Sequence, residues 1–170
     1  YIAVKASSSC GVRLNIENAR QLEEAFTAMY TQIKQKQPGA RLDGVIIQEY
    51  LPGGIELLLG CKRDPAFGPV LAFGSGGIFT EILNDISLRV LPLSRDEAKA
   101  MIEETKVSKM LAGARGTGAV DMELLVNYLI TFSELVLTNP AISEMDLNPL
   151  RAFAGRVVAL DARVILAPPL

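Results

Sequence analysis

The sequence predicts an α+β fold in which antiparallel hairpins alternate with amphipathic helices. Two extended segments, 44–50 and 55–62, are joined by a Pro-Gly-Gly turn, as in a β-hairpin. A second hairpin, formed by 143–153 and 156–166, closes the chain. Between the hairpins, apolar residues recur at helical spacing, most clearly over 124–136, before Asn-Pro ends that helix. Hairpins interleaved with helices are typical of α+β domains and not of a doubly wound parallel sheet.

The N-terminal part of the chain is predicted to hold two strands and one helix. Residues 1–6 and 12–16 are the predicted strands. Asn18 is suited to cap a helix, and Gln21 follows three residues later, as in a capping box. Apolar residues then recur at helical spacing until Pro-Gly at 38–39, which ends the helix.

The middle of the chain is predicted to hold one further strand, a helix and a loop. Residues 69–73 are the predicted strand. Ser94 and Glu97 form a second capping-box pattern, before a helix that reaches about Thr105. The glycine-flanked stretch 113–118 is predicted as a loop.

The length, charge and hydropathy of the chain exclude several classes of function. The chain has 170 residues, enough for one domain or for two small subdomains that share a cleft. The net charge is −2 and 21% of residues are charged, so the sequence lacks the basic stripe of a nucleic-acid-binding protein. No apolar run is long enough to cross a membrane, and no signal peptide is visible. We therefore expect neither a nucleic-acid nor a membrane partner.

The cysteine and histidine content narrows the chemistry further. Cys10 and Cys61 are far apart and form no CxxC pattern, so we expect reduced thiols in a cytoplasmic protein. The chain contains no histidine, which excludes histidine-dependent nucleophilic or zinc chemistry within it. Because the first residues lie inside a predicted strand, we expect the chain to be a fragment of a longer protein.

The last hairpin carries the most informative polar residues. Asp146 and Asn148 are two positions apart, so in a strand they share one face, while Leu147 points towards the core. If the turn is centred between residues 154 and 155 and no bulge intervenes, Asn148 lies opposite Asp161 with Cβ atoms roughly 5 Å apart. Two oxygen-bearing side chains at that separation can hold one Mg²⁺. The spacing alone slightly favours a solvent-exposed face.

Glu49 and Glu56 form a second pair of candidates, on the two sides of the Pro-Gly-Gly turn. A carboxylate at either position can accept hydrogen bonds from ribose hydroxyls or help to hold a metal. A solvated hairpin end is at least as consistent with their spacing.

Lys5 is the first candidate for a phosphate contact, because it ends a strand beside the small polar residues 7–9. A lysine there can reach phosphate oxygens, and the loop can offer backbone N–H groups, although no Walker A pattern is present. The alternative is an edge-strand lysine that discourages aggregation. The glycine-rich stretch 74–77 is either an anion-binding nest or a tight turn, and Arg63 and Arg89 are phosphate cations or solvated surface residues.

Several blocks of sequence together resemble one enzyme family. The blocks are Val-Lys at Lys5, Gln48-Glu49, Ile55-Glu56 with Gly60, Lys-Arg-Asp-Pro-Ala-Phe-Gly-Pro at 62–69, Phe-Gly-Ser-Gly-Gly-Ile-Phe at 73–79, Leu-Pro-Leu at 91–93, Asp-Leu-Asn-Pro at 146–149 and Leu-Asp-Ala-Arg at 160–163. In this order they resemble the ATP-grasp domain of NDP-forming acyl-CoA synthetases, including ADP-forming acetyl-CoA synthetase, and are similar to the β subunit of succinyl-CoA synthetase. The resemblance covers nearly the whole chain.

The resemblance implies a fold, ligands and site residues. It implies one ATP-grasp domain over residues 1–170, incomplete at its N-terminus, with a nucleotide cleft between two α+β subdomains. The expected ligands are ATP or ADP with Mg²⁺. In this family pattern Lys5 would bind phosphates, Glu49 would lie at the adenine–ribose hinge, Glu56 would belong to the nucleotide pocket, Asn148 and Asp161 would ligate Mg²⁺, and Asp146 would lie close by.

The implied reaction is acyl-CoA + NDP + phosphate ⇌ carboxylate + NTP + CoA, through an acyl phosphate and a phosphohistidine. The resemblance places no catalytic residue in this chain. We expect CoA-binding and phosphohistidine domains or subunits as partners, an oligomeric full-length enzyme, and no complete reaction by this chain alone.

Two departures from the family pattern concern the N-terminal part. The family has a longer, histidine-bearing loop after the strand lysine, whereas residues 7–10 here lead almost directly into Gly11. The family also has a segment before Tyr1. We expect the natural protein to carry a longer, mobile loop at this point. A true deletion is the alternative.

Two other functions stay open at this point. One is a non-catalytic nucleotide-sensing module fused to an acetyltransferase domain, which a downstream acetyltransferase sequence would reveal. The other is an ATP-grasp ligase that joins a carboxylate to an amine, although the block at 62–69 does not resemble that group. The sequence leaves open the carboxylic acid and the choice between adenine and guanine.

Overall fold

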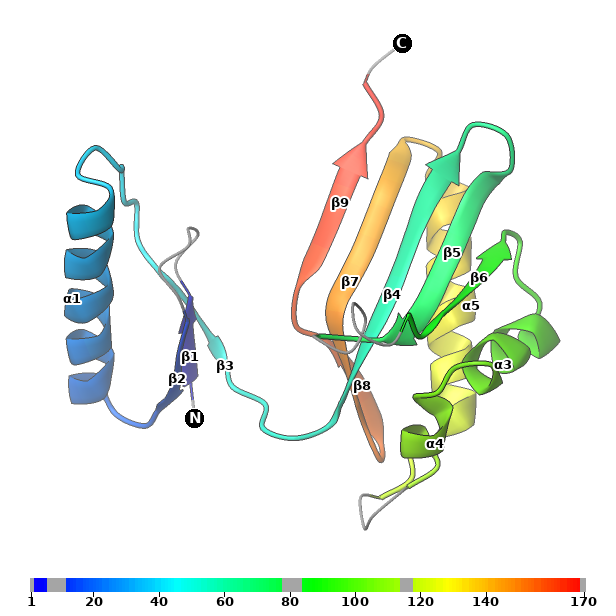
Figure 1. Ribbon diagram of the computed structural model, residues 1–170, viewed down its shortest axis with the longest axis horizontal. Coiled ribbons are helices and arrows are strands. Elements are labelled where there is room, and N and C mark those ends of the chain that lie inside the picture. The colour runs from blue at the N-terminus through cyan, green and yellow to red at the C-terminus, as the bar shows by residue number, and fades with distance from the viewer. Residues whose placement is uncertain (1, 6–11, 78–83, 114–117, 169–170) are drawn as a thin grey trace. The chain divides into compact units, whose positions relative to one another are not determined.

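The computed structural model describes residues 2–5, 12–77, 84–113 and 118–168, and for residues 2–5 it describes the backbone (Figure 1). The chain divides into two compact units, Tyr1–Pro52 and Gly53–Leu170, and each is described by itself. Among the described residues, no helix is long and apolar enough to cross a membrane.

The first unit is a small antiparallel sheet with one helix. Its strand order is β2-β1-β3, and its helix follows β2. The elements are β1 (Ile2–Lys5), β2 (Val12–Ile16), α1 (Ala19–Lys36) and β3 (Ile46–Glu49). Its core consists of buried apolar residues from β2 and α1, namely Ile16, Ala25, Met29 and Ile33. The predicted strands and helix of this part are therefore confirmed, with β3 shorter than the predicted 44–50.

The start of α1 confirms the predicted cap and corrects its detail. The side chain of Asn18 accepts a hydrogen bond from the backbone N–H of Gln21 at 3.0 Å. The side-chain oxygen of Gln21 accepts from the backbone N–H of Glu17 at 2.8 Å, one residue before the cap. Both interactions satisfy backbone donors that the first turn of a helix leaves unpaired.

The second unit is a larger antiparallel sheet with helices on one face. Its strand order is β6-β5-β4-β7-β8, and β9 also pairs with β7. The elements are β4 (Ile55–Asp64), β5 (Gly68–Ser75), β6 (Ile86–Val90), α3 (Arg95–Glu103), α4 (Ser108–Leu111), α5 (Met122–Thr138), β7 (Ile142–Phe153), β8 (Arg156–Ala159) and β9 (Ala162–Leu166). Figure 1 shows α3 and α5 against the same face of this sheet.

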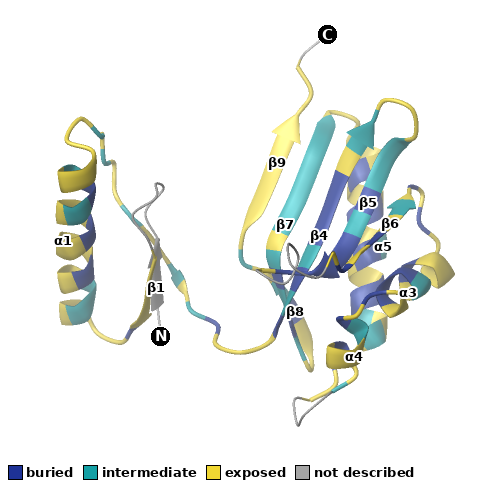
Figure 2. Cartoon of the chain, in the orientation of Figure 1, coloured by how far each residue is buried: buried dark blue, intermediate teal, exposed yellow. Residues whose placement is uncertain are grey.

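The core of this unit lies between the sheet and those helices. Figure 2 shows buried residues along β4 and β5. Alternate residues of β4, from Ile55 to Cys61, are buried against apolar side chains of α3 and α5, and Phe73 of β5 is fully buried among them. The residues between them point to the opposite face, because successive side chains of a strand alternate. That opposite face is where the polar residues of β4, β7 and β9 gather, as described below.

The predicted register of the last hairpin is confirmed. Phe153 pairs with Arg156, and the same alignment continues to Asp146 opposite Arg163. The return strand is not continuous, however, because it is divided into β8 and β9 at residues 160–161. A bulge accompanies this division: on the β4 side, Leu57 pairs with Leu150 but Leu59 pairs with Leu147. One position of β4 thus faces two of β7, one of them a proline, which has no N–H to donate.

Two elements were not predicted, and one predicted helix is shorter. The strand β6 was missed, although Ile-Ser-Leu-Arg-Val alternates with the period of a strand. The short helix α4 was missed too, and α3 ends at Glu103. The capping box of Ser94 with Glu97 is confirmed, since each side chain accepts a hydrogen bond from the other residue's backbone N–H. The predicted loop around 113–118 lies mostly outside the described residues.

Candidate functional site

On the face opposite α3 and α5, the larger sheet contains a shallow hollow of about 490 Å³. This volume falls within the usual range for sites that bind small molecules. One part of its lining is apolar and another is charged or polar. The residues used below are Leu58, Val70, Ala72 and Leu88 on the apolar part, and Lys62, Glu144, Asp146, Asn148 and Arg163 on the polar part.

The polar part is organised by Arg163 of β9. Its Nε lies 2.8 Å from Oδ2 of Asp146, which is its direct partner across the strands, and its Nη2 lies 2.5 Å from Oε1 of Glu144. The hydrogen bond with Asp146 raises the pKa of Arg163, and the charge of Glu144 adds to the effect. Lys62 is a looser neighbour, with Nζ 3.9 Å from Glu144. Asp146 therefore already has a cationic partner in this arrangement.

Asn148 and Asp161 lie opposite each other, as predicted by counting residues outward from the turn of the hairpin. The backbone N–H of Asn148 donates to the carbonyl oxygen of Asp161 at 3.2 Å. Both side chains are exposed, and Oδ1 of Asp161 accepts from the N–H of Ala162 at 3.0 Å. Leu147 packs against the core, also as predicted. Within the described residues, no three of the His, Cys, Asp and Glu side chains gather closely enough to hold a metal by themselves.

The remaining predicted residues belong to different units. Lys5 and Glu49 are the last residues of β1 and β3 in the first unit, and Glu49 is exposed. The side chain of Lys5 and the loop at 6–11 lie outside what the structure describes. Glu56 belongs to β4 of the second unit, where it forms an ion pair with Arg151 of β7.

The sequence matches known proteins along nearly its whole length. A sequence family described as an ATP-grasp domain matches residues 3–166. The β subunit of ADP-forming acetate–CoA ligase I from Pyrococcus furiosus is 44% identical over 163 residues, which are 96% of this chain and 70% of that subunit. The chain belongs to the ATP-grasp family of ADP-forming acyl-CoA synthetases.

Further relatives agree with this assignment of the synthetase domain. ADP-forming acetate–CoA ligase I of Archaeoglobus fulgidus is 39% identical, over 96% of this chain but 24% of that protein. A solved structure of acetyl-coenzyme A synthetase 1 from Ca. Korarchaeum cryptofilum, in complex with coenzyme A, Ca-AMPCP and HgCl⁺, matches with a TM-score of 0.89 at 36% identity. That match covers 98% of this chain and 76% of the other. The ATP-grasp fold implies that the synthetase domain binds a nucleotide.

Arg63 of the synthetase domain has a structural role that the sequence analysis missed. Its Nε and Nη2 each donate to a backbone carbonyl at 2.7 Å, those of Ile142 and Val136. Val136 belongs to the last turn of α5, where carbonyl groups lack helical partners. Arg63 therefore binds backbone carbonyls, a role that differs from both predicted alternatives, a phosphate contact and a solvated surface residue. These partners are distant in sequence, so no local pattern could reveal them.

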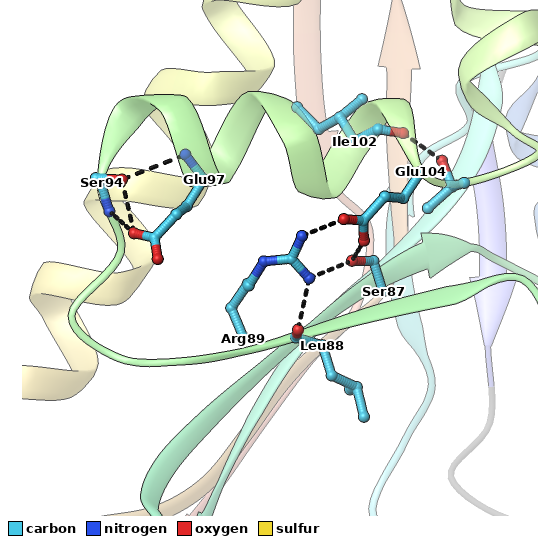
Figure 3. A network of polar contacts seen from close by, with 8 residues as sticks. Ser87, Leu88, Arg89, Ser94, Glu97, Ile102 and Glu104 are labelled. Atoms are coloured by element: carbon cyan, nitrogen blue, oxygen red, sulfur yellow. Dashed lines mark hydrogen bonds and ion pairs between the residues drawn. The ribbon is translucent and has the colours of Figure 1, made fainter.

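Arg89 is likewise held by protein groups, as Figure 3 shows. It lies on the helix-facing side of β6, where it forms an ion pair with Glu104. The hydroxyl of Ser87 donates to Oε2 of Glu104 at 2.7 Å. Hydrogen bonds from Arg89 and then from Ser87 hold the pKa of Glu104 below its ordinary value of 4.5. Arg89 therefore links β6 to the end of α3 and is not available as a phosphate cation on the other face.

This network predicts a dependence of stability on pH. Because the pKa of Glu104 is lower in the folded state, its stabilising contribution is complete above about pH 4.5 and is lost as the pH falls through the folded pKa. Glu104→Gln should lower the melting temperature near pH 7, and the difference from wild type should shrink below about pH 4.5. Thermal melts between pH 3 and 7 measure this difference. Glu103→Gln, which removes the same charge from the same helix, is the matched control, and a difference of constant size for Glu104→Gln would contradict the prediction.

Proposed function

We propose that this chain is the Mg-nucleotide-binding part of an NDP-forming acyl-CoA synthetase. The complete enzyme would convert acyl-CoA, NDP and phosphate into carboxylate, NTP and CoA. The single observation that best supports this role is the pairing of Asn148 with Asp161 beside the hollow on the face opposite α3 and α5. Two oxygen-bearing side chains, one from β7 and one from the break between β8 and β9, fit one Mg²⁺, which prefers oxygen ligands and keeps several of its sites for water or phosphate.

The residues of the second unit would divide the work between metal and nucleotide. Asn148 and Asp161 would hold the Mg²⁺, which when bound screens the charge of the phosphates. Asp146 is paired with Arg163, so we assign it a place near the metal and not a direct bond to it. Glu56 would belong to the nucleotide pocket, and the apolar part of the hollow would exclude water from it.

The first unit would contribute Lys5 and Glu49. Lys5 would contact the phosphates. Glu49 would lie at the adenine–ribose hinge and would accept hydrogen bonds from the ribose hydroxyls. We treat residues 1–170 as one ATP-grasp domain of a longer cytoplasmic protein. CoA-binding and phosphohistidine domains or subunits would complete the reaction, and the full-length enzyme would be an oligomer.

Titration calorimetry with Mg-ADP tests the proposal directly. Saturable binding by the wild-type chain, weakened when the metal is removed with EDTA, is the expected result. A chain that binds no nucleotide under either condition would contradict the proposed function. The sensing-module and amine-ligase alternatives have no observation of their own in their favour.

Lys5→Ala should weaken binding of ATP and ADP roughly 10-fold or more while leaving adenosine binding nearly unchanged. Only the phosphates would meet the ammonium group, and a charged hydrogen bond contributes about 1.5–3 kcal/mol. Parallel titrations with the three ligands measure the effect. Lys36→Ala, which removes an exposed lysine at the end of α1, is the control. An equal loss for all three ligands would show that Lys5 acts on the fold.

A further inference from the structure

The geometry points to Arg151 as a positioning residue that holds the carboxylate of Glu56 in place for the nucleotide. This role deepens the proposed function and rests on it. Arg151 would not touch the ligand. It would act through Glu56, which the proposed function assigns to the nucleotide pocket.

The two partners of the ion pair between Glu56 and Arg151 differ in exposure. Glu56 of β4 lies directly opposite Arg151 of β7, and Nη2 of Arg151 forms an ion pair with Oε1 of Glu56. The side chain of Arg151 is only 15% exposed, whereas that of Glu56 is 40% exposed. The cation is thus largely withdrawn from water while the carboxylate keeps an open side. A guanidinium group stays charged at every relevant pH and orients a carboxylate better than an ammonium group does.

A glycine turn after β5 borders Glu56. The backbone N–H of Gly76 donates to the carbonyl oxygen of Glu56 at 2.8 Å. Gly77 has φ +64°, and a Cβ at this position would lie 2.6 Å from Oε2 of Glu56. One carboxylate oxygen therefore meets Arg151, and the other lies against Gly77, where a Cβ would displace it and where the positive φ favours glycine.

The aliphatic stem of Arg151 lies beside Gly54, in the turn before β4. A Cβ on Gly54, which has φ +78°, would lie 2.8 Å from Cγ of Arg151 and 3.0 Å from the carbonyl oxygen of Ala152. The turn that leads into β4 thus packs directly against the arginine stem. Glycine turns confine both partners of the pair, which reduces the conformations that either side chain can adopt.

Two consequences follow for nucleotide binding. A carboxylate that is already oriented loses less conformational freedom when the ligand arrives, and this lowers the cost of binding. A bare carboxylate would also repel an anionic nucleotide, and the charge of Arg151 offsets that repulsion. Without Arg151, Glu56 would lose its orientation and its counter-charge together.

Arg151→Met, which keeps much of the volume but removes the charge, should weaken Mg-ADP binding about 10-fold. Arg151→Lys should restore part of the loss. In Glu56→Gln, the further replacement Arg151→Met should have little additional effect, because the arginine acts through that carboxylate. Arg95→Met is the matched control, since Arg95 forms an exposed ion pair with Glu123 on the helix side. Calorimetric titration gives the affinities, and urea unfolding gives the stability of each variant.

Several results would overturn the inference. Wild-type affinity for Mg-ADP in a folded Arg151→Met variant would overturn it. A double variant, Glu56→Gln with Arg151→Met, whose fold-loss in affinity equals the product of the two single losses would also overturn it. An affinity that recovers fully once the unfolded fraction is taken into account would show a role in stability only. If Arg151→Met does not fold, Arg151→Lys decides: affinity equal to wild type overturns the role, and a partial loss absent in the Glu56→Gln background supports it. A wild-type chain that binds no Mg-ADP would instead refute the proposed function, and this role with it.

Discussion

Asp161→Ala is expected to weaken Mg-ADP binding on the order of 100-fold, or roughly 2.8 kcal/mol. Asp161 would supply the charged ligand of the metal, while its partner Asn148 is neutral. Because Asp161 is exposed, the free energy of unfolding without ligand should change by no more than about 0.5 kcal/mol. Calorimetric titrations with and without Mg²⁺ would separate the metal-dependent part of the affinity from the rest.

The controls for Asp161 use the opposite side of the sheet. Glu134→Ala removes an exposed carboxylate from α5 and should leave the affinity unchanged. Asp161→Asn keeps the size of the side chain and should fall between wild type and Asp161→Ala. In the presence of EDTA, all variants should bind ADP alike. Equal affinity of wild type and Asp161→Ala for Mg-ADP would remove Asp161 from the metal site.

Phe73→Ala is expected to lower the free energy of unfolding of the second unit by about 3–5 kcal/mol. Phe73 is fully buried between the sheet and its helices, so the shortened side chain would leave a cavity that neighbouring residues fill only in part. This loss is a large fraction of the stability of an ordinary domain. Urea unfolding followed by circular dichroism measures it.

The same substitution at Phe67 provides the control. Phe67 is 70% exposed in the connection between β4 and β5, so Phe67→Ala should change stability by about 0.5 kcal/mol or less. Similar losses for the two variants would mean that Phe73 does not contribute to the core as its burial indicates.

Local patterns predicted much of the fold because the interactions concerned are themselves local. Asn18 and Ser94 cap helices whose first residues follow directly in the sequence. The last hairpin has a short turn, so counting outward from the turn was sufficient to pair Asn148 with Asp161. The interruption of the return strand was not predicted, since it accompanies a bulge between β7 and β4, whose pairing no local pattern specifies.

Other features depend on contacts that a linear pattern does not contain. Glu56 and Arg151 are 95 positions apart, and their meeting requires the register between β4 and β7. The strand β6 was missed although its alternation was visible, because its polar side chains face the helices and its apolar side chains face the other side of the sheet. Ser87 is buried on the helix side, whereas Leu88 is 58% exposed on the other side. Glu104, from the end of α3, accepts a hydrogen bond from Ser87 and forms an ion pair with Arg89, which makes a buried serine and a nearby arginine favourable there.

The contacts of Arg63 affect how substitutions in the Lys-Arg-Asp-Pro block should be interpreted. Arg63 fastens a hairpin to the end of α5, and the carboxylate of Asp64 accepts from the backbone N–H groups of Ala66 and Phe67. At these two positions, a stretch of sequence that is typical of the family thus has a structural role, because its side chains hold backbone segments together. A variant here that lost nucleotide affinity would resemble a ligand-contact mutant while being a folding mutant, so its unfolding curve has to be measured before its affinity is interpreted.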